Sequence, residues 1–372
     1  MVAAVMMMIV FSPNARADVR FEFGLNGGYT NNLFFDSSDV LDRHTTGTAA
    51  VKYYPLSWME LNLSGHHSVY GEIPDLSSRM GKIGFVAIPL GQDSKLAVSL
   101  SGSYDGTRYH ENLGSFNNNN FNTRLALGYR FRPSLAGRFG GTIQTTSYLA
   151  SESGDKRSAE VFAGLNATVL RNNSFDLEFG YGVADYQTID RSLKSLPVGP
   201  NGWDFDAALR SATLRSIYVS PRLSRPLGSK TGMNLTLLYR NFQNADSALV
   251  LGSSTGLLSP WSSVWEGKSV TLTVKTYLIK TLTVSTGVGY WSKAYLQTLE
   301  PGGNDYRSRS KWGTGREDIQ KRVYLQVLRP ITVWRDGLLQ PKIQIDYTHN
   351  NSTNELFNFS GFSIDTGVSL QF

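Results

Sequence analysis

The sequence predicts an all-β fold, a transmembrane antiparallel up-and-down β-barrel of about 16 strands. Three observations lead to this prediction. Apolar residues alternate with small or polar ones along most of the 372 residues. The connections between these alternating segments are short and long in turn. The mean hydropathy of −0.23 is low for a membrane protein, but it fits a wall with one apolar and one polar face.

The alternation is clearest in the last predicted strand. Successive side chains of a strand point to opposite faces, so every second residue shares a face. One face is mostly apolar and carries Phe362, Ile364, Thr366, Val368, Leu370 and Phe372. The other face is small or polar and carries Gly361, Ser363, Asp365, Gly367, Ser369 and Gln371.

Similar segments recur along the chain, each close to the about 9–11 residues that a tilted strand needs to cross a bilayer. The segment 80–90 is the least regular. Ile83 is at an odd-numbered and Val86 at an even-numbered position, so the two have opposite parity, point to opposite faces and compete for the outer face. The segment 211–226 is irregular near its end, where Pro221 lies. The predicted strands span residues 19–29, 46–54, 58–70, 80–90, 95–105, 121–131, 137–149, 158–170, 174–186, 211–226, 232–242, 268–279, 281–293, 317–330, 338–349 and 358–372.

Short turns and longer, polar loops alternate between these strands, which is typical of outer-membrane barrels. An even number of strands places both ends of the barrel on the side of the short turns, the periplasmic side. A soluble β-sandwich or β-helix is the alternative. A ring of this width is too wide to be filled by Ser, Thr, Gly and Gln, so we expect the apolar face to contact lipid. The longer links are 30–45, 71–79, 106–120, 150–157, 187–210, 243–267, 294–316 and 350–357.

The N-terminal segment has the pattern of an export signal. A short apolar run, Val2 to Phe11, is followed by Ala15-Arg16-Ala17, and Ala-x-Ala is a cleavage signature. The segment before the run lacks the usual Lys or Arg. The sequence therefore predicts a signal peptide at 1–17 and a barrel at 18–372. The absence of cysteine excludes disulfides, thiolate nucleophiles and cysteine-bound metals.

The C-terminal phenylalanine carries a resemblance to a known class of protein. The alternating strand Phe362 to Phe372 ends on Phe372, and this resembles the C-terminal signal of Gram-negative outer-membrane β-barrels. The resemblance implies a location in the bacterial outer membrane and a role for Phe372 as the assembly signal. It also implies three partners: outer-membrane lipid, lipopolysaccharide and the barrel-assembly machinery.

A second resemblance rests on two loop motifs. Residues 28–34 (GYTNNLF) and 347–352 (YTHNNS) look like loops of uncharacterised barrels linked to exopolysaccharide export, or of the barrel of surface lipoprotein assembly modifiers. This implies an export or assembly component with a periplasmic partner. The modifiers normally carry a helical-repeat domain, and this sequence has no helical 34-residue repeat.

Charge on the inward positions suggests how such a barrel treats solutes. The predicted inward positions carry more Arg and Lys than Asp and Glu, and basic residues that line a pore favour anions. We therefore expect a mild anion preference. The net charge of +6 is spread along the chain, so no nucleic-acid partner is predicted. The arginines expected to line the lumen and set selectivity are Arg124, Arg130, Arg138, Arg222, Arg240 and Arg322.

Aromatic residues fall near the ends of the predicted strands. Such positions are typical of the aromatic girdles at the two membrane interfaces, although aromatic platforms for sugars in a polysaccharide conduit would have the same composition. The candidate girdle residues are Tyr53, Tyr54, Trp58, Tyr129, Phe131, Trp291 and Trp334.

Catalytic patterns are weak. His66 and Ser68 resemble the His-x-Ser pair of outer-membrane phospholipase and lipid A deacylase barrels, in which histidine takes the serine proton. In those families an asparagine commonly follows the serine, whereas Val69 follows here. Paired carboxylates of a protease site, Asp204 with Asp206 or Asp346 near His349, lack specific spacing. No Asp-x-Asp-x-Asp-Gly run is present, so no metal site is predicted.

The sequence therefore favours a porin-like channel for the passive passage of small polar solutes. In this interpretation the protein is not an enzyme and uses no cofactor. The first alternative is an outer-membrane component of exopolysaccharide or surface lipoprotein export. The second is an outer-membrane lipid hydrolase that uses His66 and Ser68.

Overall fold

A computed structural model describes most of the barrel residue by residue. The described residues are 18–33, 40–90, 94–149, 155–169, 172–189, 209–244, 265–279, 281–295, 317–333, 337–353 and 355–372. The predicted signal peptide, 1–17, lies outside them. Within them, no helix is long and apolar enough to cross a membrane.

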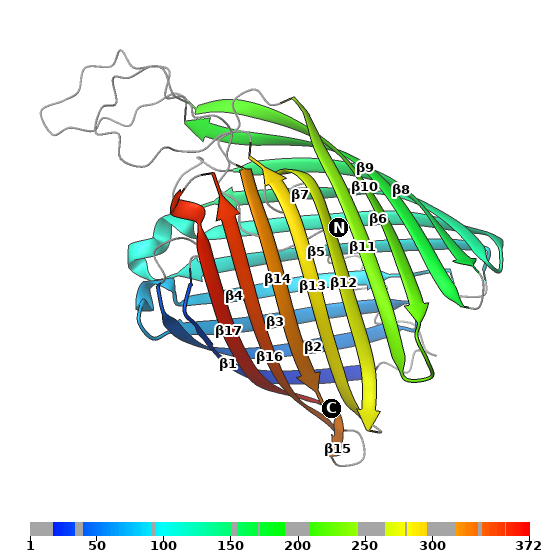
Figure 1. Cartoon of the computed structure of the whole chain (residues 1–372), viewed down its shortest axis with the longest axis horizontal. Helices are drawn as coiled ribbons and strands as arrows, with labels where there is room; N and C mark the ends of the chain where they lie inside the picture. The colour runs from blue at the N-terminus through cyan, green and yellow to red at the C-terminus, as the bar shows by residue number, and fades with distance from the viewer. Residues whose placement is uncertain are drawn as a thin grey trace, which may run out of the picture.

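The described strands form a single antiparallel sheet that curls into a ring (Figure 1). Short 3₁₀ helices, η1 (Pro74–Leu76), η2 (Glu111–Phe116) and η3 (Glu355–Phe357), lie in connections between strands. The strands are β1 (Asp18–Thr30), β2 (Asp42–Leu56), β3 (Met59–Tyr70), β4 (Ser78–Ala87), β5 (Leu96–Tyr109), β6 (Asn118–Arg132), β7 (Leu135–Tyr148), β8 (Lys156–Val169), β9 (Asn173–Ile189), β10 (Leu209–Pro226), β11 (Thr231–Asn244), β12 (Glu266–Ile279), β13 (Leu282–Ala294), β14 (Glu317–Leu328), β15 (Ile331–Val333), β16 (Gly337–Ser352) and β17 (Phe359–Gln371).

The ring closes between the first and the last strand. β1 pairs with β2 on one side and with β17 on the other. At this seam Phe21 N–H donates to the Phe372 carbonyl (2.7 Å), and Phe372 N–H donates to the Phe21 carbonyl (3.0 Å). The three-residue β15 and β14 both pair with β16, so they share one position in the wall. The result is a closed 16-strand barrel, which confirms the predicted fold.

The cross-strand register separates an apolar outer face from a polar inner face. On β1, Phe23 and Leu25 are 47% and 56% exposed on the outer face. On β4, Ile83 is outward and 52% exposed, whereas Val86 has the opposite parity and faces the lumen. This resolves the ambiguity of the weakest predicted strand. The apolar outer face indicates that the wall contacts lipid, as the sequence predicted.

Several strands extend further toward the long-loop end than predicted. β2 begins at Asp42 rather than at residue 46. The fully buried Asp42 carboxylate accepts hydrogen bonds from the backbone N–H groups of Gly71 and Glu72, both at 3.0 Å. One carboxylate therefore accepts the backbone hydrogen bonds of the segment that follows β3 and connects this segment to the start of β2. The alternation of apolar residues could not reveal this because the contact is polar and non-local.

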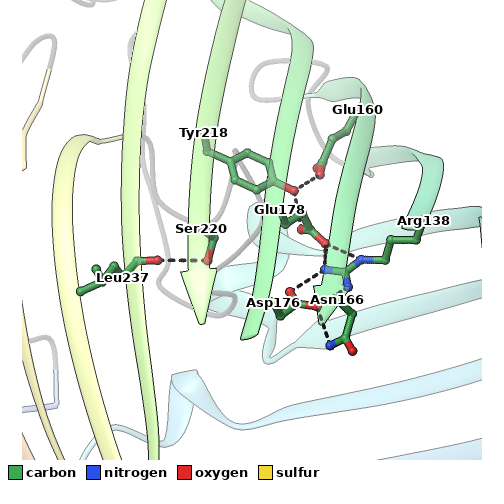
Figure 2. Close-up of polar contacts among 8 residues, drawn as sticks. All are labelled: Arg138, Glu160, Asn166, Asp176, Glu178, Tyr218, Ser220 and Leu237. Atoms are coloured by element: carbon green, nitrogen blue, oxygen red, sulfur yellow. Dashed lines mark hydrogen bonds and ion pairs between the residues drawn. The ribbon is translucent and has the colours of Figure 1, made fainter. Parts of the chain in front are cut away.

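Pro221 lies inside β10, where a proline removes a donor from the ladder. The paired positions of β10 and β11 skip Ser220 and Pro221. The Ser220 hydroxyl donates to the Leu237 carbonyl on β11 (3.1 Å), so a side chain takes the place of a backbone donor (Figure 2).

Candidate functional site

A network of charged side chains lies on the lumen face of β7 to β10 (Figure 2). The Arg138 guanidinium forms an ion pair with Asp176, and one of its nitrogens donates to Asp176 Oδ1 at 2.8 Å. The same guanidinium donates to Glu178 Oε2 at 2.8 Å. Asn166 Nδ2 lies 3.4 Å from Asp176 Oδ2. Two carboxylates therefore face one arginine, and the trio has a formal charge of −1 when both are ionised.

A glycine makes the reach of Arg138 geometrically feasible. Arg138 on β7 pairs with Gly164 on β8, and Gly164 pairs with Glu178 on β9. A Cβ added at Gly164 would lie 2.8 Å from Arg138 Nε. The arginine therefore crosses β8 over a position that has no side chain.

A tyrosine joins this network to the next row of the wall. The Tyr218 hydroxyl lies 2.8 Å from Glu178 Oε1 and 2.9 Å from Glu160 Oε1 (Figure 2). The Tyr218 ring, 2% exposed, lies over Gly180, where an added Cβ would meet the ring carbon Cε1 at 2.0 Å. In the same row the Phe162 ring covers Gly140. Glycines therefore alternate with aromatic rings along this row and allow the rings to lie flat against the wall.

Two arginines beside the network have no carboxylate ion pair among the described residues. Arg124 lies over the Phe162 ring, with its guanidinium carbon 4.3 Å from the ring centroid. Arg222 is opposite Asp176 in register. Together with the paired Arg138 they line a hollow of about 240 Å³, whose other lining residues are Asp176, Glu178 and Ser220.

A buried aromatic cluster lies nearby on the wall. Arg240 pairs with Tyr218 in register and is 1% exposed, and its guanidinium lies 4.3 Å from the centroid of the Trp265 ring. Trp265 packs with Tyr218, Leu238 and Trp291. Trp291 is 6% exposed and shares the lumen face with Ser269, so its assignment to an interfacial girdle was wrong. Its parity places it inside because Val288 and Tyr290 occupy the outward positions of β13.

The register places all of the arginines predicted to line the lumen on the inner face. Arg138, Arg222 and Arg240 belong to the wall of β7 to β11 just described. Arg130 is exposed near the short-turn end of β6. Arg322 on β14 lies apart from the others and its Nε donates to Asp346 Oδ1 at 2.7 Å. The inward arginines are therefore not equivalent, because Arg138 and Arg322 are held by carboxylates while Arg124 and Arg222 are not.

The candidates for catalysis that lie in the described strands are not assembled into a site. His66 and Ser68 both face the lumen, and the Ser68 hydroxyl is bonded to Thr46 Oγ1 at 2.8 Å. Asp346 faces the lumen, whereas His349 has the opposite parity and contacts Ser360 Oγ at 2.9 Å. Among the described residues there is no cluster of three or more His, Cys, Asp or Glu that could hold a metal.

Two carboxylates of the protease pattern and one girdle residue belong to segments outside the described ranges. Asp204, Asp206 and Trp334 lie outside the described residues.

Sequence reasoning missed Tyr218, Trp265 and Gly164 as parts of the site. The inward acids could be read from parity, but the partners of Tyr218 are 40 and 58 positions away. The recurrence of inward glycines beside inward aromatics is the one signal that could have indicated the stacked rows.

Comparisons with known proteins establish only the fold. No protein-family model matches the chain, and no curated protein matches it. The solved structure of Acinetobacter baumannii OccAB1 is similar, with a TM-score of 0.51 and 10% identity over 97% of this chain and 99% of that chain. CdiB from Acinetobacter baumannii has a TM-score of 0.51 and 11% identity over 95% of this chain and 60% of that chain. The chain thus has the fold of a Gram-negative outer-membrane β-barrel.

Proposed function

We propose that this barrel is a porin-like channel through which small polar solutes cross the outer membrane passively. The observation that carries the proposal is the polar, charged inner face of a wall whose outer face is apolar. Such a wall encloses an aqueous path. The fold shared with OccAB1 supports it, because that protein belongs to the outer-membrane porins.

We further propose a mild preference for anions. Arg138 faces two carboxylates and Arg322 faces one, so neither adds net positive charge locally. Arg124 and Arg222 line the same hollow without an ion pair in the described wall. We therefore expect Arg124 and Arg222 to set the preference for anions, whereas sequence analysis assigned this role equally to all six lumen arginines. Salt screens such charges over about 8–10 Å, so the preference depends on ionic strength.

The buried part of the lumen wall supports a second candidate. Leu238 and Trp291 lie at lumen-facing positions of their strands and Trp265 packs against them, yet all three are at most 6% exposed. A lumen that is narrowed here fits an export or assembly component that opens with a periplasmic partner. No contact in the described wall favours the hydrolase alternative, since the Ser68 hydroxyl is engaged by Thr46.

Conductance of the refolded chain Asp18 to Phe372 in planar bilayers tests the proposal. Folding is first checked by heat-modifiable gel mobility. Steady conductance, with a reversal potential of the sign expected for anions in a salt gradient, would support the channel. A folded but silent protein would refute an open porin and favour the export component. A cation-selective reversal potential would refute only the anion preference.

A further inference from the structure

A basic row lies on the outer face of β3 to β5, whereas the network described above lies on the lumen face of β7 to β10. His67 on β3 pairs with Arg79 on β4, and Arg79 pairs with Arg108 on β5. All three side chains are exposed. Each lies within three residues of the strand end nearest the long loops, which is the outer-leaflet end of an outer-membrane barrel.

In the described part of the chain, the two arginines of this row form no ion pair with an acidic side chain. Arg79 has no ion pair among the described residues. Arg108 donates to the Asn118 carbonyl (2.9 Å) and to Asn119 Oδ1 (2.9 Å), both uncharged. The nearby carboxylate of Asp75 is engaged by Asn112 (2.9 Å) and His110 (3.2 Å). Like charges directly opposite in a sheet repel each other, so an outside anion would relieve this pair.

The wall below the basic row provides room for a headgroup. The next outward row consists of Gly65, Gly81 and Gly106, which pair with one another in register and end at Asn119 on β6. The Arg108 guanidinium reaches over Gly106, so the open part of the row is at Gly65 and Gly81. A Cβ added at Gly81 would have no atom within 4 Å. The row after that is apolar and consists of Leu63, Ile83, Tyr104 and Phe121, exposed by 60%, 52%, 48% and 46%.

We propose that this surface of β3 to β6 binds the phosphate-bearing headgroup of lipopolysaccharide. The order from the loop end downward is basic, bare and apolar, and it matches phosphate, sugar and acyl chain in a lipid of the outer leaflet. Arginine is suited to the phosphate because its donors form charge-assisted, bidentate hydrogen bonds. A protein partner would not require an apolar row at the depth of the acyl chains.

The test is binding of purified lipid A to the refolded barrel in detergent, measured by native mass spectrometry. The key variant is R79Q/R108Q, and the matched control is R157Q. Arg157 is also outward, exposed and near the loop end, but it lies opposite Asp185. We expect R157Q to bind bis-phosphorylated lipid A like the parent, and the double variant to bind it at least about tenfold more weakly. Dephosphorylated lipid A should bind the parent as weakly as lipid A binds the double variant.

A second variant keeps the test independent of the arginines. In Gly81→Leu the added Cβ has no atom within 4 Å, and we expect the rest of the side chain to occupy the glycine row. The variant should fold, as judged by heat-modifiable gel mobility, but should no longer bind lipid A. Unchanged binding by R79Q/R108Q, or by a folded G81L, would overturn the proposal, as would an equal loss in R157Q. Displacement of lipid A by millimolar inorganic phosphate would also overturn it, because the row would then be a site for free anions.

Discussion

The guanidinium of Arg138 crosses a neighbouring strand and donates to the Glu178 carboxylate at 2.8 Å. Gly164 lies between them in register. Ion pairs between adjacent strands are common, but this one joins β7 to β9 and leaves β8 beneath it. The contact fixes the charge distribution of the lumen wall, because it determines whether two acids face the solvent alone or with a partner.

Substitution of Gly164 by leucine should displace Arg138 from that path. An added Cβ would lie 2.8 Å from Arg138 Nε, so the arginine has to move and Asp176 and Glu178 lose their partner. We expect the reversal potential in a salt gradient to shift toward cations. Gly81→Ala, on the outer face with free space around it, is the control. An unchanged reversal potential in a folded G164L barrel would contradict the electrostatic role of this pair.

Arg222→Gln should reduce the anion preference. Arg222 lines the hollow beside Asp176 and lacks an ion pair in the described wall, so its charge acts on passing ions. Arg225→Gln removes the same charge from the same strand but from the outward parity. The reversal potentials of the two variants are compared at low salt, where screening is weakest. Equal shifts in both would mean that overall charge, rather than the lumen position, sets selectivity.

Tyr218→Phe should destabilise the barrel. The variant removes the hydroxyl shared by Glu160 and Glu178. Glu160 then loses the Tyr218 donor, while Glu178 keeps the donor from Arg138. A lost hydrogen bond to a charged group costs about 1.5–3 kcal/mol, which urea titration of the refolded barrel would resolve. Tyr239→Phe is the control, because Tyr239 is on the outer face and 52% exposed. It should leave the midpoint of urea unfolding unchanged. A Tyr218→Phe midpoint equal to that of the parent would refute the bridging role.

Trp265→Ala should raise both conductance and anion preference. The indole ring covers the Arg240 guanidinium at 4.3 Å, and its removal both widens the lumen and uncovers a positive charge. Single-channel recording measures the two effects together. Trp58→Ala, in the short turn between β2 and β3 and 41% exposed, is the control. A conductance that stays at the parent value would show that Trp265 does not border the conducting path.

Phe372→Ala should slow assembly into the folded barrel. Phe372 stacks with Phe21 and Phe23 at 5.8 Å and 6.0 Å between ring centroids, so it belongs to the seam as well as to the proposed assembly signal. The folded fraction is followed over time by heat-modifiable mobility, with and without the assembly machinery. Phe131→Ala, an equally outward aromatic far from the seam, is the control. A defect confined to reactions that contain the machinery would assign Phe372 to recognition rather than to packing.

Parity alone was sufficient to predict the wall. The alternation around Phe362 and Ile364 gave the outer face, and the same rule placed Arg124 and Arg222 inside. Parity also decides Trp291, but the prediction for that residue relied on its position near a strand end. Parity does not predict contacts between side chains on different strands. Tyr218 reaches Glu160 because Gly180, its partner in register, has no side chain, and this can be known only from the register.

The closure between β1 and β17 sets the order in which this wall can form. Each other neighbouring pair is consecutive along the wall and close in the chain, while at the seam Phe362 N–H donates to Asn31 Oδ1 across 331 positions. Hairpins can therefore form locally, and one long-range event remains. Its entropic cost grows slowly with chain length, by about 0.6 kcal/mol per doubling. Until it occurs the sheet has two unpaired edges, and afterwards it has none, so a single contact between distant strands removes the main route to aggregation.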